Sequence, residues 1–92
     1  MYADCDEADA RAAFDRLRPQ ASTPYFEPCS LAAFPDVPAT YVVAAKDRIV
    51  NPAWSRRAAP ERLGVAAVEL PGSHSPYLAR PGALAELLAA QA

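Results

Sequence analysis

Residues 39–52, ATYVVAAKDRIVNP, hold the pattern that decides the fold. The first seven carry no charge and are rich in β-branched and aromatic side chains. A run of this kind is typical of a parallel strand that is covered on both faces. Three charged residues, 46–48, end the strand, and Asn51 followed by Pro52 predicts a helix with asparagine as its cap. The stretch therefore predicts a buried strand, a short loop and a helix.

A second strand and a second helix are predicted further along the chain. The helix that begins at Pro52 is expected to end near Pro60, the second strand is expected at residues 65–70, and the final helix is expected from about Pro81. This order predicts an α/β fold in which a crossover helix joins two parallel strands. Five apolar side chains of the strands are expected to share one core: Tyr41, Val42, Val43, Val65 and Val68.

Two parallel strands make an incomplete sheet, because a parallel sheet has neighbouring strands and is covered on both faces. We therefore expect residues 39–92 to form the edge of a larger sheet. An unpaired strand edge and an uncovered leucine face on the last helix leave apolar surface open. The expected consequence is that the isolated chain self-associates or is only marginally folded.

Residues 1–38 have a different character. Asp6 to Arg18 is predicted to be an amphipathic helix that is capped by Asp6 and stopped by Pro19. Five prolines between positions 19 and 38 exclude long regular structure there. We expect this segment to be a connector that is anchored on a surface by four apolar side chains: Tyr25, Phe26, Leu31 and Phe34.

The composition narrows the classes of function. Apolar residues make up 52% of the 92 residues, so disorder is not expected, although 22 residues are alanines that each bury little area. The net charge of −2 does not indicate binding to a nucleic acid, and the absence of a long apolar run does not indicate a membrane span. The first ten residues are acidic, which does not fit a secretory signal. A cytoplasmic protein is expected, with Cys5 and Cys29 as reduced thiols and a disulfide as the less favoured alternative.

Asp47 and His74 occupy the positions at which chemistry is expected. Ligands of open parallel sheets bind outside the carboxyl ends of the strands, and each of these residues follows one predicted strand. An aspartate there can fix the tautomer of a histidine and leave its other nitrogen free as a base. The spacing alone leaves a second interpretation open, in which Asp47 caps a turn and His74 makes a single backbone bond. The sequence contains no pair of ligand residues at the spacing of a metal site, so no metal is expected. No cofactor is expected either.

Two stretches resemble the α/β-hydrolase family. Residues 41–52 are similar to the strand and loop that carry the acid of its catalytic triad, and residues 70–78, LPGSHSPYL, are similar to the loop that carries its histidine. Residues 2–20 resemble the end of the family's cap region. The resemblance implies a partial α/β-hydrolase fold, with a cap-region remnant at 1–38 and the C-terminal part of the core at 39–92. The branch it resembles most contains small esterases, plant-type methylesterases and hydroxynitrile lyases.

The resemblance assigns roles to the two residues and leaves one role empty. It implies that Asp47 orients His74 and that His74 is the general base. The family's nucleophile lies on a Gly-x-Ser-x-Gly turn, and the chain contains no such motif. Ser73 and Ser75 flank the histidine but are not expected to act as nucleophiles. The lyases carry a lysine directly after the histidine, so Ser75 at that position favours ester hydrolysis.

These observations predict the C-terminal segment of a serine α/β-hydrolase that acts on a small-molecule ester. The isolated chain is expected to be inactive, because the nucleophile and the oxyanion hole belong to an upstream part. The alternative is an interaction module that kept this edge of the fold and lost the chemistry.

Overall fold

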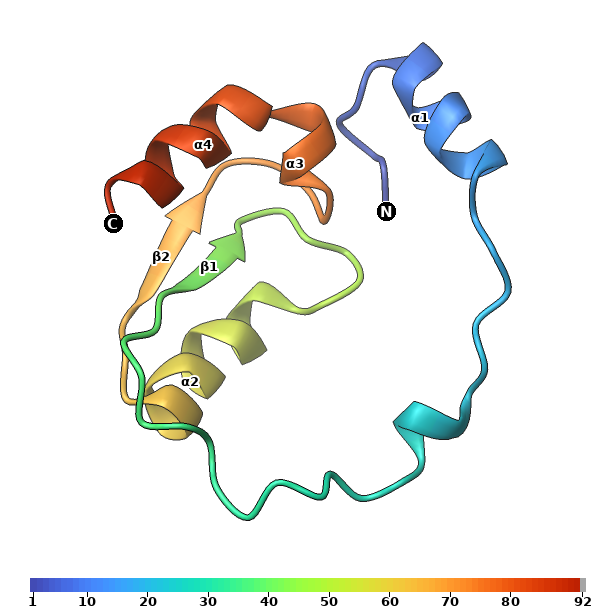
Figure 1. The fold of residues 1–92 in the computed structure, drawn as a ribbon. Coiled ribbons are helices and arrows are strands. Elements are labelled where there is room, and N and C mark those ends of the chain that lie inside the picture. The colour runs from blue at the N-terminus through green and yellow to red at the C-terminus, as the bar shows by residue number, and fades with distance from the viewer. Residues whose placement is uncertain (92) are drawn as a thin grey trace.

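A computed structural model describes residues 1–91 of the chain. Its elements follow in this order: α1 (Glu7–Asp15), the 3-10 turn η1 (Thr23–Tyr25), β1 (Tyr41–Ala44), α2 (Pro52–Leu63), β2 (Ala67–Leu70), α3 (Pro76–Ala79) and α4 (Pro81–Ala89). The strands and helices from β1 onward gather in one half of the molecule, while α1 and the connector run around it (Figure 1).

The sheet consists of β1 and β2, which pair in parallel from Tyr41 opposite Ala67 to Ala44 opposite Leu70. The predicted strand–helix–strand unit is therefore confirmed. Helix α2 packs against both strands, and α4 lies on their other side in the view of Figure 1. A hydrogen bond of 3.4 Å between the hydroxyls of Tyr41 and Ser55 marks the sheet face that is turned toward α2.

The core is smaller than predicted and is built differently. Its buried apolar residues are Val43, Ala58, Ala59 and Leu70. Val68 is exposed, and Val65 lies before β2 instead of within it, so the prediction of one shared core for the five strand residues was wrong. Paired residues of parallel strands point to the same face, and successive residues alternate. Val68 therefore lies on the face opposite Val43, where little of the described chain covers it.

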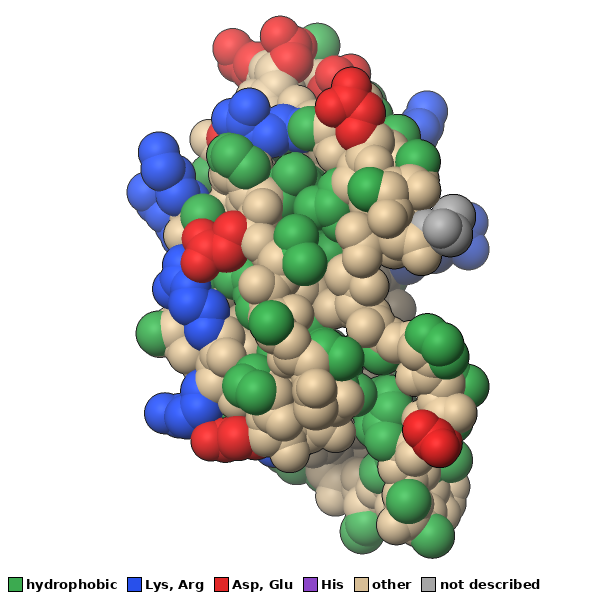
Figure 2. Space-filling view, turned by 90° about the vertical axis from the view of Figure 1, so that its left-hand side faces the viewer, with side chains coloured by type: hydrophobic (Ala, Val, Ile, Leu, Met, Phe, Trp, Pro, Cys, Tyr) green, Lys and Arg blue, Asp and Glu red, His purple; other side chains and the backbone are tan. Residues whose placement is uncertain are grey.

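The molecule is more open than a compact domain of its length. Its radius of gyration is 15.1 Å, whereas about 12 Å is expected for a compact chain of this size. Its accessible surface is 7261 Å², whereas about 5,200 Å² is expected from its mass. Figure 2 shows hydrophobic side chains exposed down the middle of one face, between charged groups. The chain alone therefore leaves much of its apolar surface in contact with water.

Two predicted helix boundaries need correction. Helix α1 ends at Asp15 instead of Arg18, although Asp6 caps it as predicted by accepting a hydrogen bond of 2.9 Å from the Ala8 amide. Helix α2 continues through Pro60 and ends at Gly64, whose φ of 65° is the left-handed conformation that terminates helices. Because Pro60 lies in the last turn, it disturbs few of the backbone hydrogen bonds of the helix. Gly64, not Pro60, therefore sets the end of α2.

The connector does not pack as predicted. Tyr25, Phe26, Leu31 and Phe34 are all exposed instead of anchored. The segment sweeps around the molecule at a distance from the sheet (Figure 1). The sequence pattern identified apolar side chains correctly, but none of the four is buried in the part of the chain that the structure describes.

Candidate active site

The first half of the site is the turn that follows β1. Asp47 Oδ1 accepts hydrogen bonds of 2.7 Å from the amide of Ile49 and 3.0 Å from the amide of Val50. This is the arrangement that short acidic side chains form in turns, and it holds the carboxylate in one orientation. The second carboxylate oxygen remains free to bind another group.

The second half is the loop between β2 and α3, which carries His74. The Nδ1 atom of His74 lies 2.8 Å from Asp47 Oδ2. The predicted contact between the two side chains is therefore present. A backbone hydrogen bond of 2.9 Å from the Lys46 amide to the Gly72 carbonyl extends the parallel ladder into the two loops. The sheet thus brings the two loops together at its carboxyl end, as parallel pairing requires.

The geometry fixes the tautomer of the imidazole. An ionised carboxylate only accepts hydrogen bonds, so Nδ1 carries the proton and donates it to Asp47. The Asp47 side chain is 11% exposed and that of His74 is 28% exposed. Burial pushes the pKa of Asp47 upward, but the hydrogen bonds from His74, Ile49 and Val50 outweigh it and hold the pKa below its usual value. Asp47 is therefore charged near neutral pH.

In a neutral imidazole, this arrangement leaves Nε2 of His74 with a free lone pair. An imidazole held in this tautomer by a carboxylate can accept a proton from a hydroxyl placed next to Nε2. His74 and Asp47 also line a hollow of about 280 Å³ whose other walls include Val42, Ala44 and Leu84. The pair therefore borders an open, largely apolar surface.

Neither neighbouring serine is suited to act as the nucleophile. Ser73 is buried, and its hydroxyl donates a short hydrogen bond to Asp4 Oδ1. Ser75 is fully buried, and its hydroxyl has no hydrogen-bond partner within residues 1–91. Neither serine is among the described residues that line the hollow beside His74. A nucleophile that uses His74 has to come from a different segment.

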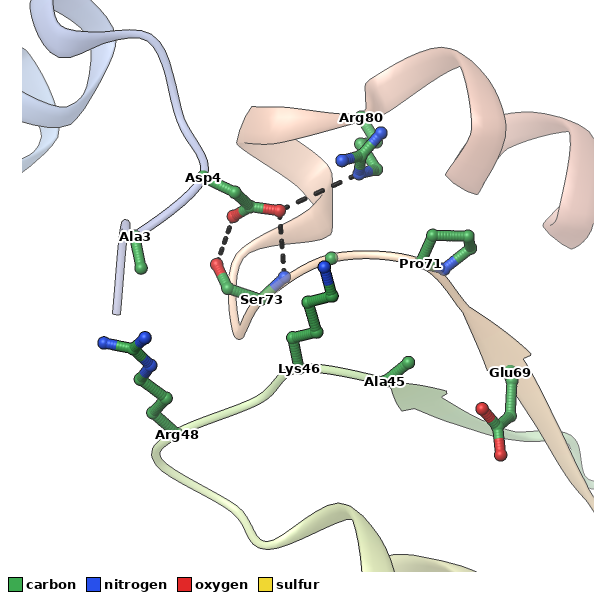
Figure 3. Close-up of a pocket in the computed structure, with 10 residues that line it drawn as sticks. Ala3, Asp4, Ala45, Lys46, Arg48, Glu69, Pro71, Ser73 and Arg80 are labelled. Carbon is green, nitrogen blue, oxygen red and sulfur yellow. Dashed lines mark hydrogen bonds and ion pairs between the residues drawn. The ribbon is translucent and has the colours of Figure 1, made fainter.

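The contact between Asp4 and the loop that carries His74 could not be predicted from the sequence. Asp4 Oδ2 accepts a hydrogen bond of 2.9 Å from the Ser73 amide and lies 3.8 Å from Nε of Arg80. Figure 3 shows the Asp4 carboxylate reaching from the N-terminal segment onto the loop directly before His74. The partners are separated by 69 positions, and no periodic pattern connects them.

Other kinds of site find little support in the part of the chain that the structure describes. No group of three or more His, Cys, Asp or Glu side chains within residues 1–91 is placed to hold a metal ion. Cys5 and Cys29 are free thiols. Among the described helices, none is long and apolar enough to cross a membrane.

The fold and the site define a parallel α/β segment with a histidine–aspartate pair at the carboxyl end of its strands. Residues 1–87 match the sequence model of the alpha/beta hydrolase family. No significant match is found among curated proteins or among solved structures. Because the family model covers nearly the whole chain, the chain belongs to the alpha/beta hydrolase family.

Proposed function

We propose that the chain supplies the acid and the histidine of a serine hydrolase that cleaves small-molecule esters. The observation that carries the proposal is the hydrogen bond of 2.8 Å between His74 Nδ1 and Asp47. In the proposed role, Asp47 orients the imidazole and stabilises the imidazolium that forms. His74 Nε2 takes the proton of a serine hydroxyl and later returns it to the leaving alcohol.

The nucleophile and the oxyanion hole in this proposal lie on a segment outside the 92 residues. The proposal is supported by the absence of a Gly-x-Ser-x-Gly turn from the sequence and by the burial of Ser73 and Ser75. A hydrolase core placed against the open strand and the exposed Val68 would also cover apolar surface that is now in water. In this view, the chain alone has half of a catalytic site and no activity.

Ester hydrolysis is preferred to cyanohydrin cleavage within the family branch that the sequence resembles. In the lyases, a lysine ammonium directly after the histidine helps to hold cyanide. Here the corresponding residue is Ser75, which is uncharged and fully buried. No cation stands at this position to stabilise an anionic product.

The test compares the chain alone with the chain supplemented by a hydrolase N-terminal portion that carries the nucleophile. The chain alone is expected to hydrolyse p-nitrophenyl acetate no faster than free imidazole, because loss of the nucleophile from a complete triad costs about 10⁶ in turnover. The supplemented chain is expected to turn over the ester, and His74→Ala should abolish that activity. Turnover by the chain alone that disappears with Ser73→Ala or Ser75→Ala would contradict the proposal.

A second candidate is a non-catalytic interaction module. It is favoured by the aromatic side chains of the connector, Tyr25, Phe26 and Phe34, which are exposed. The coding DNA upstream of Met1 distinguishes the two candidates. An in-frame Gly-x-Ser-x-Gly turn there supports the hydrolase, whereas its absence supports the module.

A further inference from the structure

Asp4 holds the histidine loop through both oxygens of its carboxylate. Oδ2 accepts a hydrogen bond of 2.9 Å from the Ser73 amide, and Oδ1 accepts the short bond from the Ser73 hydroxyl. Arg80, at the start of α4, lies 3.8 Å from Oδ2 and adds a positive charge on the outer side (Figure 3). Bonds to an ionised acceptor are shorter and stronger than neutral ones. One carboxylate thus fixes one residue at two points.

Gly72 allows the carboxylate to approach this closely. Its φ of +115° lies in the region that favours glycine, and a β-carbon at this position would lie 2.5 Å from Asp4 Oδ2 and 2.8 Å from Nε of Arg80. Any other side chain would displace the carboxylate or the arginine. Because Gly72 has no side chain, the backbone of the loop is accessible to the Asp4 carboxylate.

The two residues before His74 are consequently held from opposite directions. The Gly72 carbonyl accepts a hydrogen bond of 2.9 Å from the amide of Lys46, which belongs to the turn that carries Asp47. The Ser73 amide donates to Asp4, which belongs to the N-terminal segment. With Gly72 and Ser73 both anchored, the backbone that carries the imidazole has little freedom to rotate.

We propose that Asp4 is a positioning residue that fixes Ser73, so that His74 keeps its Nδ1 atom turned toward Asp47. Asp4 touches neither the imidazole nor any reacting atom and acts only through the loop. Its importance for catalysis rests on the function proposed above, whereas the geometry it imposes can be measured without turnover. In this way the N-terminal segment that leads into α1 is coupled to His74 in the loop after β2.

The hydrogen bonds of Asp4 keep it ionised, which the role requires. The hydroxyl and the amide of Ser73 hold the pKa of Asp4 below its usual value, and Arg80 contributes in the same direction. The anchor is therefore charged near neutral pH.

The test uses the 92-residue chain and the variant Asp4→Ala, with Asp15→Ala as the matched control. Asp15 is also a carboxylate with an arginine partner, Arg11, at 3.4 Å, but it lies on α1 and makes no contact with the loop. Two quantities are measured by NMR: hydrogen exchange of the Ser73 amide, and the fraction of neutral His74 that carries its proton on Nδ1. His74 is the only histidine, so its signals need no assignment.

Asp4→Ala is expected to lower the exchange protection of Ser73 at least tenfold and the Nδ1–H fraction severalfold. Asp15→Ala should change neither. The Ala45 amide directly follows β1 and donates a hydrogen bond of 3.0 Å to the carbonyl of Leu70, the last residue of β2; it reports global unfolding and should stay protected in both variants. Asp4→Asn can accept from the Ser73 amide and donate to its hydroxyl, so partial rescue of the Nδ1–H fraction is expected.

Three outcomes would overturn the proposal. The first is an Nδ1–H fraction in Asp4→Ala that equals that of the wild type. The second is an equal loss of protection at Ser73 and Ala45, which would mean that Asp4 acts on folding as a whole. The third is a wild-type chain whose Ser73 amide is unprotected. Failure of the supplemented chain to hydrolyse an ester would instead remove the proposed function and leave the positioning role of Asp4 intact.

Discussion

Asp47 makes two kinds of contact, and two substitutions at this position separate them. Oδ1 accepts from the amides of Ile49 and Val50, and Oδ2 accepts from His74. Asp47→Ala removes all three hydrogen bonds. Asp47→Asn keeps one acceptor oxygen, which will face the two backbone amides because two donors outweigh one. The amide nitrogen of the asparagine then faces His74, where it donates.

The two variants are expected to differ in stability. A hydrogen bond to a charged group contributes about 1.5–3 kcal/mol when buried, but water can replace the acceptor at the exposed amides of Ile49 and Val50. We expect Asp47→Ala to cost about 2–3 kcal/mol and Asp47→Asn about 1 kcal/mol, since only the histidine bond and the charge are lost. The midpoint of urea unfolding, followed by the fluorescence of Trp54, measures this difference.

The tautomer of His74 is expected to change most in Asp47→Asn, the variant that loses less stability. The asparagine places an N–H donor where the carboxylate oxygen accepted, which forces the imidazole proton from Nδ1 to Nε2 and so removes the free base. An asparagine in place of the aspartate of a complete Ser-His-Asp triad lowers turnover about 10⁴-fold, and a similar loss is expected in the supplemented chain if the proposed function is correct. Long-range ¹⁵N NMR on neutral His74 shows the tautomer directly. An Asp47→Asn chain that retains the Nδ1–H form would refute the reasoning, because it would mean that the carboxylate does not orient the imidazole.

Three further predictions concern the chain as a whole. The isolated chain is expected to self-associate or to be only marginally folded, because it exposes roughly 2,000 Å² more surface than a compact domain of its mass; a stable, cooperative monomer in sedimentation would contradict this. The folded pKa values of Asp4 and Asp47 lie below their unfolded values, so their contribution to stability is present above about pH 4 and is lost as the pH falls through the folded pKa values. When the midpoint of urea unfolding is measured against pH, Asp4→Ala and Asp47→Ala should therefore show a smaller decrease on the acidic side than the wild type. Pro60→Ala should raise stability by about 1–3 kcal/mol, since it restores an amide in the last turn of α2, and an unchanged urea midpoint would show that the helix does not need that bond.

Local rules predicted the elements whose causes lie within a few residues. Asp6 and Asn51 both cap helices as the sequence indicates, and the uncharged run at 39–45 contains β1. The parallel pairing follows from the same short-range order, because a helix that separates two strands brings them side by side. The pairing then places the loops of Asp47 and His74 next to each other, which is why their contact could be predicted.

Features that depend on distant or missing neighbours could not be predicted. The hydrogen bond between Asp4 and Ser73 joins residues that no pattern connects, so only the fold reveals it. The exposure of Val68 and Phe34 has the opposite origin, because apolar side chains predict burial only where a partner surface exists. Both failures arise from tertiary context, which determines which residues meet but leaves no mark on local periodicity.

The two interpretations of Asp47 that the spacing left open describe the same carboxylate. Its turn contacts use Oδ1 and thereby aim Oδ2 at His74, so the structural role is a condition of the proposed catalytic role. Asp47→Glu tests this dependence, because it keeps the charge but lengthens the side chain by one carbon, and turn caps of this type require the shorter residue. We expect the variant to lose stability and to show a mixture of His74 tautomers, although a carboxylate is still within reach. A glutamate variant with the wild-type Nδ1–H fraction would mean that charge alone orients the histidine and that the turn has no part in it.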